Sequence, residues 1–374
     1  MAIERRRLLA LTAAFGLAPC LPVAASQPGG LYLSARADRR RPGAFAFSGL
    51  DAAGSRLFDI PLPGRGHSVA VHPRAPLAVV FARRPGRFAV VVDWRRGQIA
   101  ARIAPPDDRH FYGHGVFSGD GRLLYACEND FENRRGVIGI YATGRRFARV
   151  GEFPSFGIGP HDIHLLPDGV TLAVANGGIA THPDLRRVKL NIPTMAPSLV
   201  LLDRRDGGFE KKLQLAPSLH KASIRHLAQA RAGRLVAAMQ YEGPAGDLVP
   251  LIAVSEHGGP LRVFDKPAAA IRALRQYCGS VAFDRAGAMI AASSPRGGVL
   301  TFWEADTGAH LFTTEIADVC GVAAAGGAGR FLASSGRGDL FHVDVRGKRV
   351  ARIGPPSAGG TAWDNHLVAV DLPR

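Results

Sequence analysis

Several motifs that would assign a chemistry are missing from this chain. It has no G-x-S-x-G nucleophile elbow and no H-E-x-x-H zinc-protease motif, which argues against two hydrolase classes. It also has no basic helix, zinc finger or aromatic RNA-binding motif, although Lys and Arg (47) exceed Asp and Glu (31) for a net charge of +16. Much of the excess is Arg in turns, as in 83–87 (RRPGR) and 93–97 (DWRRG). A field of this sign would attract anions, nucleic acid or an anionic membrane face, but charge scattered without a recognition element indicates a solvated surface, and we expect no nucleic-acid partner.

Amphipathic helices are also absent beyond the N-terminal segment, whereas turns are frequent. The 374 residues include 45 Gly and 26 Pro, which are spread along the chain rather than clustered. Short apolar runs separated by Gly and Pro favour strands over helices, as in 76–84 (PLAVVFARR) and 87–94 (RFAVVVDW). The chain is therefore predicted to be all-β.

Residues 1–26 have the layout of a signal peptide. A charged start precedes an apolar run over 8–21, and small residues follow at 23–26. Arg5-Arg6-Arg7 resembles the twin-arginine export signal, so we expect a twin-arginine-type signal peptide, a mature domain over 27–374 and a periplasmic location. A lipid anchor at Cys20 is the alternative, which the preceding proline disfavours. No other stretch is long and apolar enough to span a bilayer.

One pattern recurs seven times through the mature chain. Each copy has a His or Cys close to a Gly, followed by alternating apolar residues, a turn and a second β-like run. The residues that lead the copies are His67, His114, His161, His226, Cys278, Cys320 and His366, with spacings of 47, 47, 65, 52, 42 and 46. A period near 45 residues with four short strands per unit is typical of a β-propeller.

The copies predict a seven-bladed propeller closed by the two ends of the chain. The last copy, 364–370, has almost no chain after it, while three unpaired runs lie at 31–37, 44–50 and 56–62. The N-terminal strands can therefore complete the last blade beside the C-terminal strand, which removes the exposed edges of an open array. The longest interval contains an insertion, 176–197, which we predict to be a loop.

The innermost strands of a propeller line its central channel, so the leading residues are predicted to converge at one mouth. Imidazoles that share a confined site suit transition metals. The candidate metal ligands are His67, His114, His161, His164, His226, Cys278, Cys320 and His366. His110 is a further candidate near the mouth. The alternative is a network of buried structural hydrogen bonds, as histidines make in WD-type repeats.

Three roles are open for two of the cysteines in the mature chain. Cys278 and Cys320 lead adjacent blades, so they could form a disulfide, bind a metal or pack in the core. As ligands, their sulfur atoms would favour copper or iron over calcium. Cys127 is expected in the core.

Polar residues beside the ring and after the second strands are predicted to line a pocket. These residues are Glu128, Asn129, Asp162, Asn176 and Asn365. Asp184 and Lys189 of the insertion could help to cover the mouth. Ordinary turn hydrogen bonding is the alternative role for the loop residues.

Long motifs of the chain resemble a known family. They lie at 113–132, 160–191, 223–228, 277–284 and 363–367. Together they resemble the exported propeller family catalogued as domain of unknown function 1513, over essentially the whole mature chain. Its members are often encoded near imelysin-like and di-haem peroxidase-like proteins. The resemblance thus implies a link to iron or haem handling and makes those proteins candidate partners.

Three functions remain open from the sequence. The first is a monomeric periplasmic protein that binds a transition metal, iron or copper, or a metal-containing ligand at the channel mouth. The second is a metal-dependent enzyme. The third is a scaffold without catalysis that docks another protein.

Overall fold

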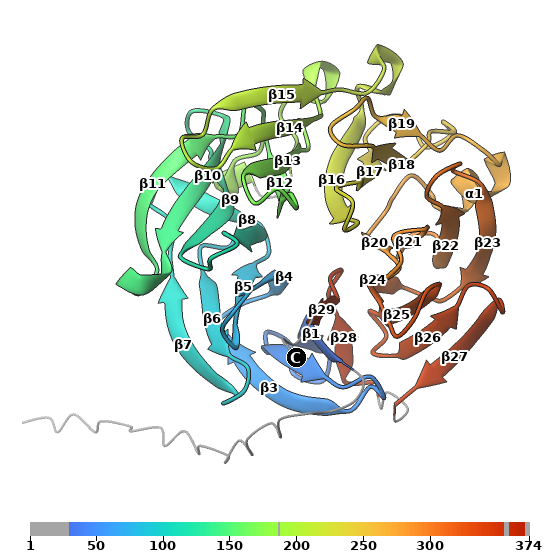
Figure 1. The fold of residues 1–374 in the computed structure, drawn as a ribbon, viewed down its shortest axis with the longest axis horizontal. Coiled ribbons are helices and arrows are strands. Elements are labelled where there is room, and N and C mark those ends of the chain that lie inside the picture. Colours follow the sequence, from blue (N-terminus) through green and yellow to red (C-terminus); the bar gives the residue numbers. More distant parts are fainter. Residues whose placement is uncertain (1–29, 186–187, 355–358, 371–374) are drawn as a thin grey trace, which may run out of the picture.

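The computed structural model describes residues 30–185, 188–354 and 359–370. These residues form seven small antiparallel sheets, arranged as blades around one axis (Figure 1). The prediction of an all-β, seven-bladed propeller is therefore confirmed. The expected signal peptide, residues 1–26, lies outside the described residues. Within the described segments, no helix is long and apolar enough to cross a membrane.

Six blades have four strands each. In each of these blades, the strand that comes first in the chain lies nearest the axis (Figure 1). The first two blades are β4 (Gly66–Val71), β5 (Leu77–Ala82), β6 (Ala89–Asp93) and β7 (Gln98–Ile103), then β8 (Arg109–Phe117), β9 (Leu123–Asp130), β10 (Arg135–Ala142) and β11 (Ala148–Pro154). The next two are β12 (Pro160–Leu165), β13 (Thr171–Asn176), β14 (Ser198–Asp203) and β15 (Phe209–Leu213), then β16 (Ala222–Gln229), β17 (Leu235–Tyr241), β18 (Ile252–Ser255) and β19 (Arg262–Val263). The last two are β20 (Ser280–Phe283), β21 (Met289–Ser294), β22 (Val299–Glu304) and β23 (His310–Glu315), then β24 (Val319–Ala324), β25 (Arg330–Ser335), β26 (Leu340–Asp344) and β27 (Arg349–Ile353).

The seventh blade joins the two ends of the chain, as predicted. Its strands are β1 (Leu31–Asp38), β2 (Phe45–Leu50), β3 (Arg56–Leu62), β28 (Thr361–Trp363) and β29 (Val368–Val370). Both C-terminal strands pair antiparallel with β1, which places Arg36 opposite Trp363 and Leu33 opposite Val368. The closing blade thus depends on contacts between residues more than three hundred positions apart.

Burial within a blade follows the distance of each strand from the axis. All five residues of the third strand β6 are buried, because neighbouring blades cover both of its faces. By contrast, four of the five residues of the outermost strand β15 are exposed. The middle strands therefore appear in the sequence as continuous apolar runs, and the outer strands as polar ones.

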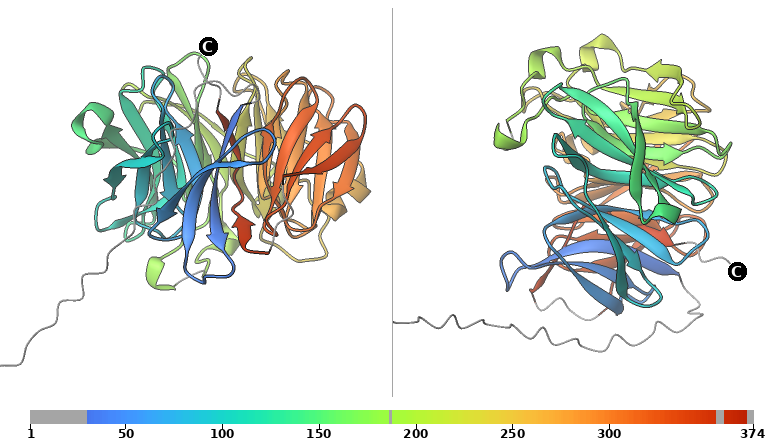
Figure 2. Two further views of the ribbon diagram at one scale, coloured as in Figure 1. Left: turned by 90° about the horizontal axis from the view of Figure 1, so that it is seen from below. Right: turned by 90° about the vertical axis from the view of Figure 1, so that its left-hand side faces the viewer.

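The remaining elements are short. They are the 3₁₀ turns η1 (Thr143–Arg145), η2 (Pro183–Leu185), η3 (Ile192–Thr194) and η4 (Pro217–Leu219), and the helix α1 (Ala268–Ala273). The segment between β13 and β14 carries η2 and η3 and projects from one face of the disc, so the described part of the predicted insertion is a loop and not a blade (Figure 2). The sequence did not predict α1, which buries Ala270 and Ile271.

Candidate metal centre

Five histidines from five different blades meet on the propeller axis. They are His67, His114, His161, His226 and His366, and each is at most 9% exposed. Their rings lie in mutual contact: the centroids of His67 and His366 are 4.5 Å apart, and those of His161 and His226 are 4.7 Å apart. Residues separated by up to three hundred positions thus form one compact group of imidazoles.

Breaks in the strand pairing aim these side chains at the axis. In four inner strands the register with the second strand shifts beside the histidine, between Gly66 and Val69, Phe111 and Gly115, Pro160 and Asp162, and Ile224 and His226. Such bulges bend a strand and redirect a side chain. His366 reaches the axis from the break between β28 and β29.

Two buried carboxylates orient two of the rings. Nδ1 of His67 lies 2.8 Å from Oδ1 of Asp364, and Nδ1 of His114 lies 2.9 Å from Oδ1 of Asp162. Since both carboxylates accept, each ring donates its Nδ1–H and leaves Nε2 as the atom with a free lone pair. A carboxylate behind an imidazole in this way is the usual support of a metal-bound histidine.

Burial keeps four of the imidazoles neutral, and the carboxylate of Asp162 is held ionised. Burial lowers the pKa of His67 to about 4, against the hydrogen bond that His67 donates to Asp364. Burial also lowers the pKa of His161, His226 and His366 well below the usual value. The pKa of Asp162 is lowered: burial opposes this, but the interaction with His114 outweighs it. Metal binding requires neutral imidazole, so these rings are in the competent state at neutral pH.

The donor atoms fit a transition metal. Two groups, His67–His114–His161 and His114–His226–His366, each offer three ring nitrogens within 4.8 Å of one another, and they share His114. Four of the rings carry buried nitrogens that have no hydrogen-bond partner in the described chain: His114 Nε2, His161 Nδ1, both nitrogens of His226, and His366 Nε2. Buried polar atoms are normally hydrogen-bonded, so this concentration of lone pairs is unusual. Neutral imidazole donors suit zinc, copper, iron and nickel.

Four predicted candidates lie outside the histidine cluster: His164, His110, Cys278 and Cys320. His164 belongs to neither donor group: its side chain is 31% exposed and borders a second cavity, and its Nε2 lies 3.8 Å from Oδ1 of Asp162. His110 is held inside its own blade, by the carbonyl of Phe111 and the side chain of Asn129. The third candidate, Cys278, packs in an apolar core between blades. It precedes β20, which pairs with β21 without a bulge, so nothing turns its side chain to the axis.

The described cysteines are free thiols, so the disulfide alternative does not hold in this structure. Burial raises the pKa of both Cys278 and Cys320 to about 12. Cys320 borders the channel mouth, where its Sγ lies 3.2 Å from the carbonyl of Asp318, but it belongs to neither histidine group. The argument from sulfur for copper or iron therefore loses its basis.

The predicted pocket residues divide into two sets. Asn365 lines the mouth and Asp162 supports the cluster. The other three have structural contacts: Glu128 accepts hydrogen bonds from Tyr141 and Arg149 within its own blade, Asn129 donates to the carbonyl of Thr181, and Asn176 accepts from Ser155. Glu128, Asn129 and Asn176 are absent from the described lining of the mouth.

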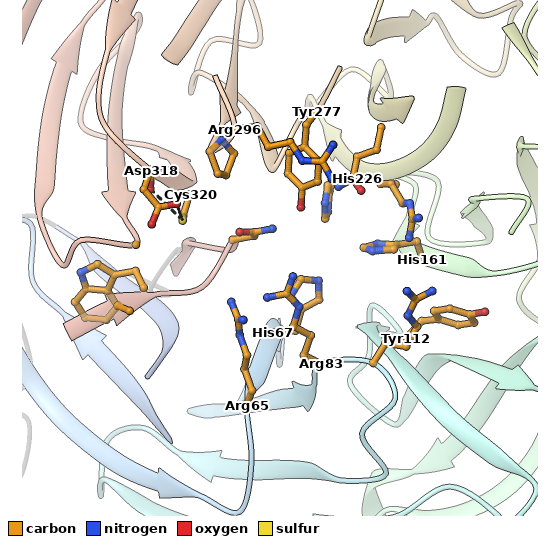
Figure 3. Close-up of a pocket in the computed structure, with 18 of the residues that line it drawn as sticks. Arg65, His67, Arg83, Tyr112, His161, His226, Tyr277, Arg296, Asp318 and Cys320 are labelled. Atoms are coloured by element: carbon orange, nitrogen blue, oxygen red, sulfur yellow. Dashed lines mark hydrogen bonds between the residues drawn. The ribbon is translucent and has the colours of Figure 1, made fainter. Parts of the chain in front are cut away.

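A cavity of about 520 Å³ opens directly above the histidines. His67, His161 and His226 form its floor, and Arg65, Arg83 and Arg296 surround it (Figure 3). Lys189 of the β13–β14 segment also lines it, whereas Asp184 of the same segment does not. The sequence pattern did not point to these arginines, because Arg83 and Arg84 lie in a segment that is typical of a solvated turn. Nor did it point to Asp364, although this residue lies only two positions before His366.

Fold and site together define a propeller with an axial histidine cluster beneath a basic mouth. The chain belongs to the family described as "Protein of unknown function (DUF1513)", whose sequence profile matches residues 60–370. No curated protein matches the chain. Among solved structures it is similar to Kuenenia stuttgartiensis hydrazine synthase, with 14% identity and a TM-score of 0.62, over 93% of this chain and 99% of that one. At this identity the likeness shows the fold alone.

Proposed function

We propose that this protein is a periplasmic propeller that binds a transition-metal ion at the axial histidine cluster. The observation that carries the proposal is the set of buried ring nitrogens on His114, His161, His226 and His366 that have no partner among the described residues. Leaving such atoms without a partner costs stability, and ligation to a metal would offset that cost.

The test is metal uptake by the purified mature chain. We expect saturable binding of Fe²⁺, Cu²⁺, Zn²⁺ or Ni²⁺, measured by elemental analysis after dialysis and by competition with a coloured chelator. The double variant His114→Ala/His226→Ala should lose this binding, because His114 belongs to both donor groups. The matched control is His220→Ala, which removes an exposed imidazole that belongs to neither donor group and should bind as the unaltered protein does. If no metal binds, or if the double variant binds equally well, the proposal is wrong.

Export and a role in iron or haem handling are part of the same proposal. They are supported by the leader over residues 1–26 and by the gene neighbourhoods of the family, which make imelysin-like and di-haem peroxidase-like proteins the partners to test. Cell fractionation, with and without Arg5→Lys/Arg6→Lys/Arg7→Lys, tests export by the twin-arginine route. Loss of the periplasmic pool in the variant is the expected result.

A second candidate function is metal-dependent catalysis. The cavity of about 520 Å³ borders three of the cluster histidines, so a substrate could approach a bound ion directly. This candidate predicts turnover that disappears together with metal uptake in the double variant.

A further inference from the structure

The mouth cavity is lined by an excess of cationic side chains. Seven described residues that line it are basic: Arg39, Arg65, Arg83, Arg84, Lys189, Arg225 and Arg296. Only two of its described lining residues, Glu242 and Asp318, are acidic. Low-dielectric walls lined by one sign of charge focus the field and concentrate counter-ions. The cavity therefore favours an anion.

Arg225 is a buried cation whose charge the protein compensates only weakly. Its side chain is 10% exposed, and its closest carboxylate, Glu242, is 3.7 Å away. Lys189 already pairs with that same carboxylate, and the buried Nε of Arg225 has no hydrogen-bond partner within the described structure. Burial and the charge of Arg84 lower the pKa of Arg225 to about 10, which shows how weakly its charge is compensated. A buried guanidinium in this state can donate two hydrogen bonds to an oxyanion.

A bound metal would add to this excess of positive charge. The cluster imidazoles are neutral donors and offset none of it. The nearest carboxylates, Asp162 and Asp364, already accept hydrogen bonds from His114 and His67, and Asp364 is also paired with Arg65 at 2.6 Å. These two carboxylates offset part of the charge of a bound metal, but the seven basic residues of the mouth still exceed its two acidic ones, which favours an anion above the metal.

We propose that the mouth cavity binds a small oxyanion with two or more charged groups, carboxylates or phosphates, that accompanies the metal to the histidine cluster. The inference rests on the proposed function, since the anion is the companion of that metal. The volume of about 520 Å³ is of the size that small-molecule ligands occupy, and it suits a tricarboxylate or a diphosphate. Arg225, Arg83 and Arg296 come from separate parts of the ring, so an anion with several charged groups can contact more of them than a single carboxylate can.

The test is calorimetric titration of the metal-free protein with citrate and with pyrophosphate, and with acetate for comparison. We expect saturable binding of citrate or pyrophosphate that weakens as salt rises, and much weaker binding of acetate. Tighter binding of citrate assigns the site to carboxylates, and tighter binding of pyrophosphate assigns it to phosphates. Binding of neither at millimolar concentration, or binding no tighter than that of acetate, overturns the inference.

Two variants locate the site. Arg225→Gln should weaken anion binding by about tenfold or more, because a charge-assisted pair is lost. Arg296→Gln is a second variant at an exposed position, where misfolding is not expected. The matched control is Arg231→Gln, an exposed position in the turn after β16, which should bind within about twofold of the unaltered protein. Equal loss in the control overturns the inference.

The two proposals fail in different ways. All of these variants leave the cluster histidines in place, so metal uptake should persist in them. If the protein binds the anion but takes up no metal, the proposed metal-binding function is wrong and the anion is not a companion of a metal. The mouth cavity would then still be an anion-binding site. Metal uptake without anion binding would overturn only the present inference.

Discussion

Oδ1 of Asp162 lies 2.9 Å from Nδ1 of His114, and this contact joins two neighbouring blades at the axis. The other oxygen of Asp162 accepts the backbone N–H of Leu227 at 2.8 Å, in the next blade along the chain. One buried carboxylate thus fixes the ring of His114 and ties β16, which carries His226, to the same point. The support of His114 thus comes from the strand β12 of the next blade, whereas Asp364, which supports His67, lies in the break between β28 and β29.

This contact predicts that Asp162→Asn weakens metal binding by about 10–100-fold, as loss of such supporting carboxylates usually does. The amide can still accept from Leu227 N–H, so the fold should survive. Metal affinity is measured by competition with a chelator of known affinity. Asp120→Asn is the control, since Asp120 caps a turn on the neighbouring blade through Ser118 and Arg122. Equal affinity in the two variants would contradict a supporting role for Asp162.

Gly113 gives a second prediction, because a side chain at this position would meet His67. Its φ is +106°, and a Cβ there would lie 2.6 Å from Cδ2 of the His67 ring. Gly113→Ala should therefore lower both stability and metal affinity, the latter by roughly tenfold. Gly43→Ala is the matched control: its φ is +86°, with nothing within 4 Å of the added Cβ.

The control separates backbone strain from displacement of the ring. Both variants should lose about 1–2 kcal/mol of stability in urea unfolding, since both place alanine in the left-handed region. Only Gly113→Ala should lose metal affinity. If both variants bind metal normally, the position of His67 is not needed for binding.

The repeat predicted the five cluster histidines, because the residue that leads each copy stands near the start of an inner strand. The same repeat also led to Cys278 and Cys320, which join neither histidine group: Cys278 packs in the core before β20, and Cys320 borders the mouth although β24 is bulged beside it. His164 was included for its proximity to His161, yet it borders the opposite cavity.

The basic mouth was harder to predict than the histidines. Arg83 and Arg84 end a strand in an RRPGR turn, and a turn signal does not say which face of a propeller the turn lies on. Arg225 immediately precedes His226, but the repeat gave no reason to single it out. Closure of the ring is what brings these charges together, and it is a property of the whole chain.

The third prediction concerns pH and uses His110, which lies outside the cluster. Burial lowers the pKa of His110 to about 4, against the hydrogen bond to the carbonyl of Phe111. The unfolded chain takes up this proton near pH 6.5, and the folded one only near pH 4. The free energy of unfolding should therefore fall as pH falls through this window, by roughly 3 kcal/mol for this residue.

Urea unfolding of the metal-free protein at several pH values measures this effect. The cluster histidines with lowered pKa act in the same direction, so the contribution of His110 is read from the difference between variants. His110→Gln should flatten the pH dependence, whereas His220→Gln, at an exposed position, should leave it unchanged. An equal slope in both variants would contradict the assignment.

The fourth prediction couples closure of the ring to the metal. Leu33 is fully buried and packs in the core that includes Phe47 and Val370, so Leu33→Ala should lower the free energy of unfolding by about 2–5 kcal/mol. Val150→Ala, at a position 48% exposed, should change it by no more than about 0.5 kcal/mol. Urea unfolding measures both.

Metal should restore part of the stability lost in Leu33→Ala, because His366 lies in the same closing blade and binds only when that blade is assembled. At a free metal concentration of about 100 times Kd, the gain from binding to the folded state is about 2.7 kcal/mol. In the double variant Leu33→Ala/His114→Ala this gain should disappear, since both donor groups lose a member. An equal gain in the two backgrounds would mean that the metal binds elsewhere. Restoration in Leu33→Ala alone would show that one site at the axis holds the two ends of the chain together.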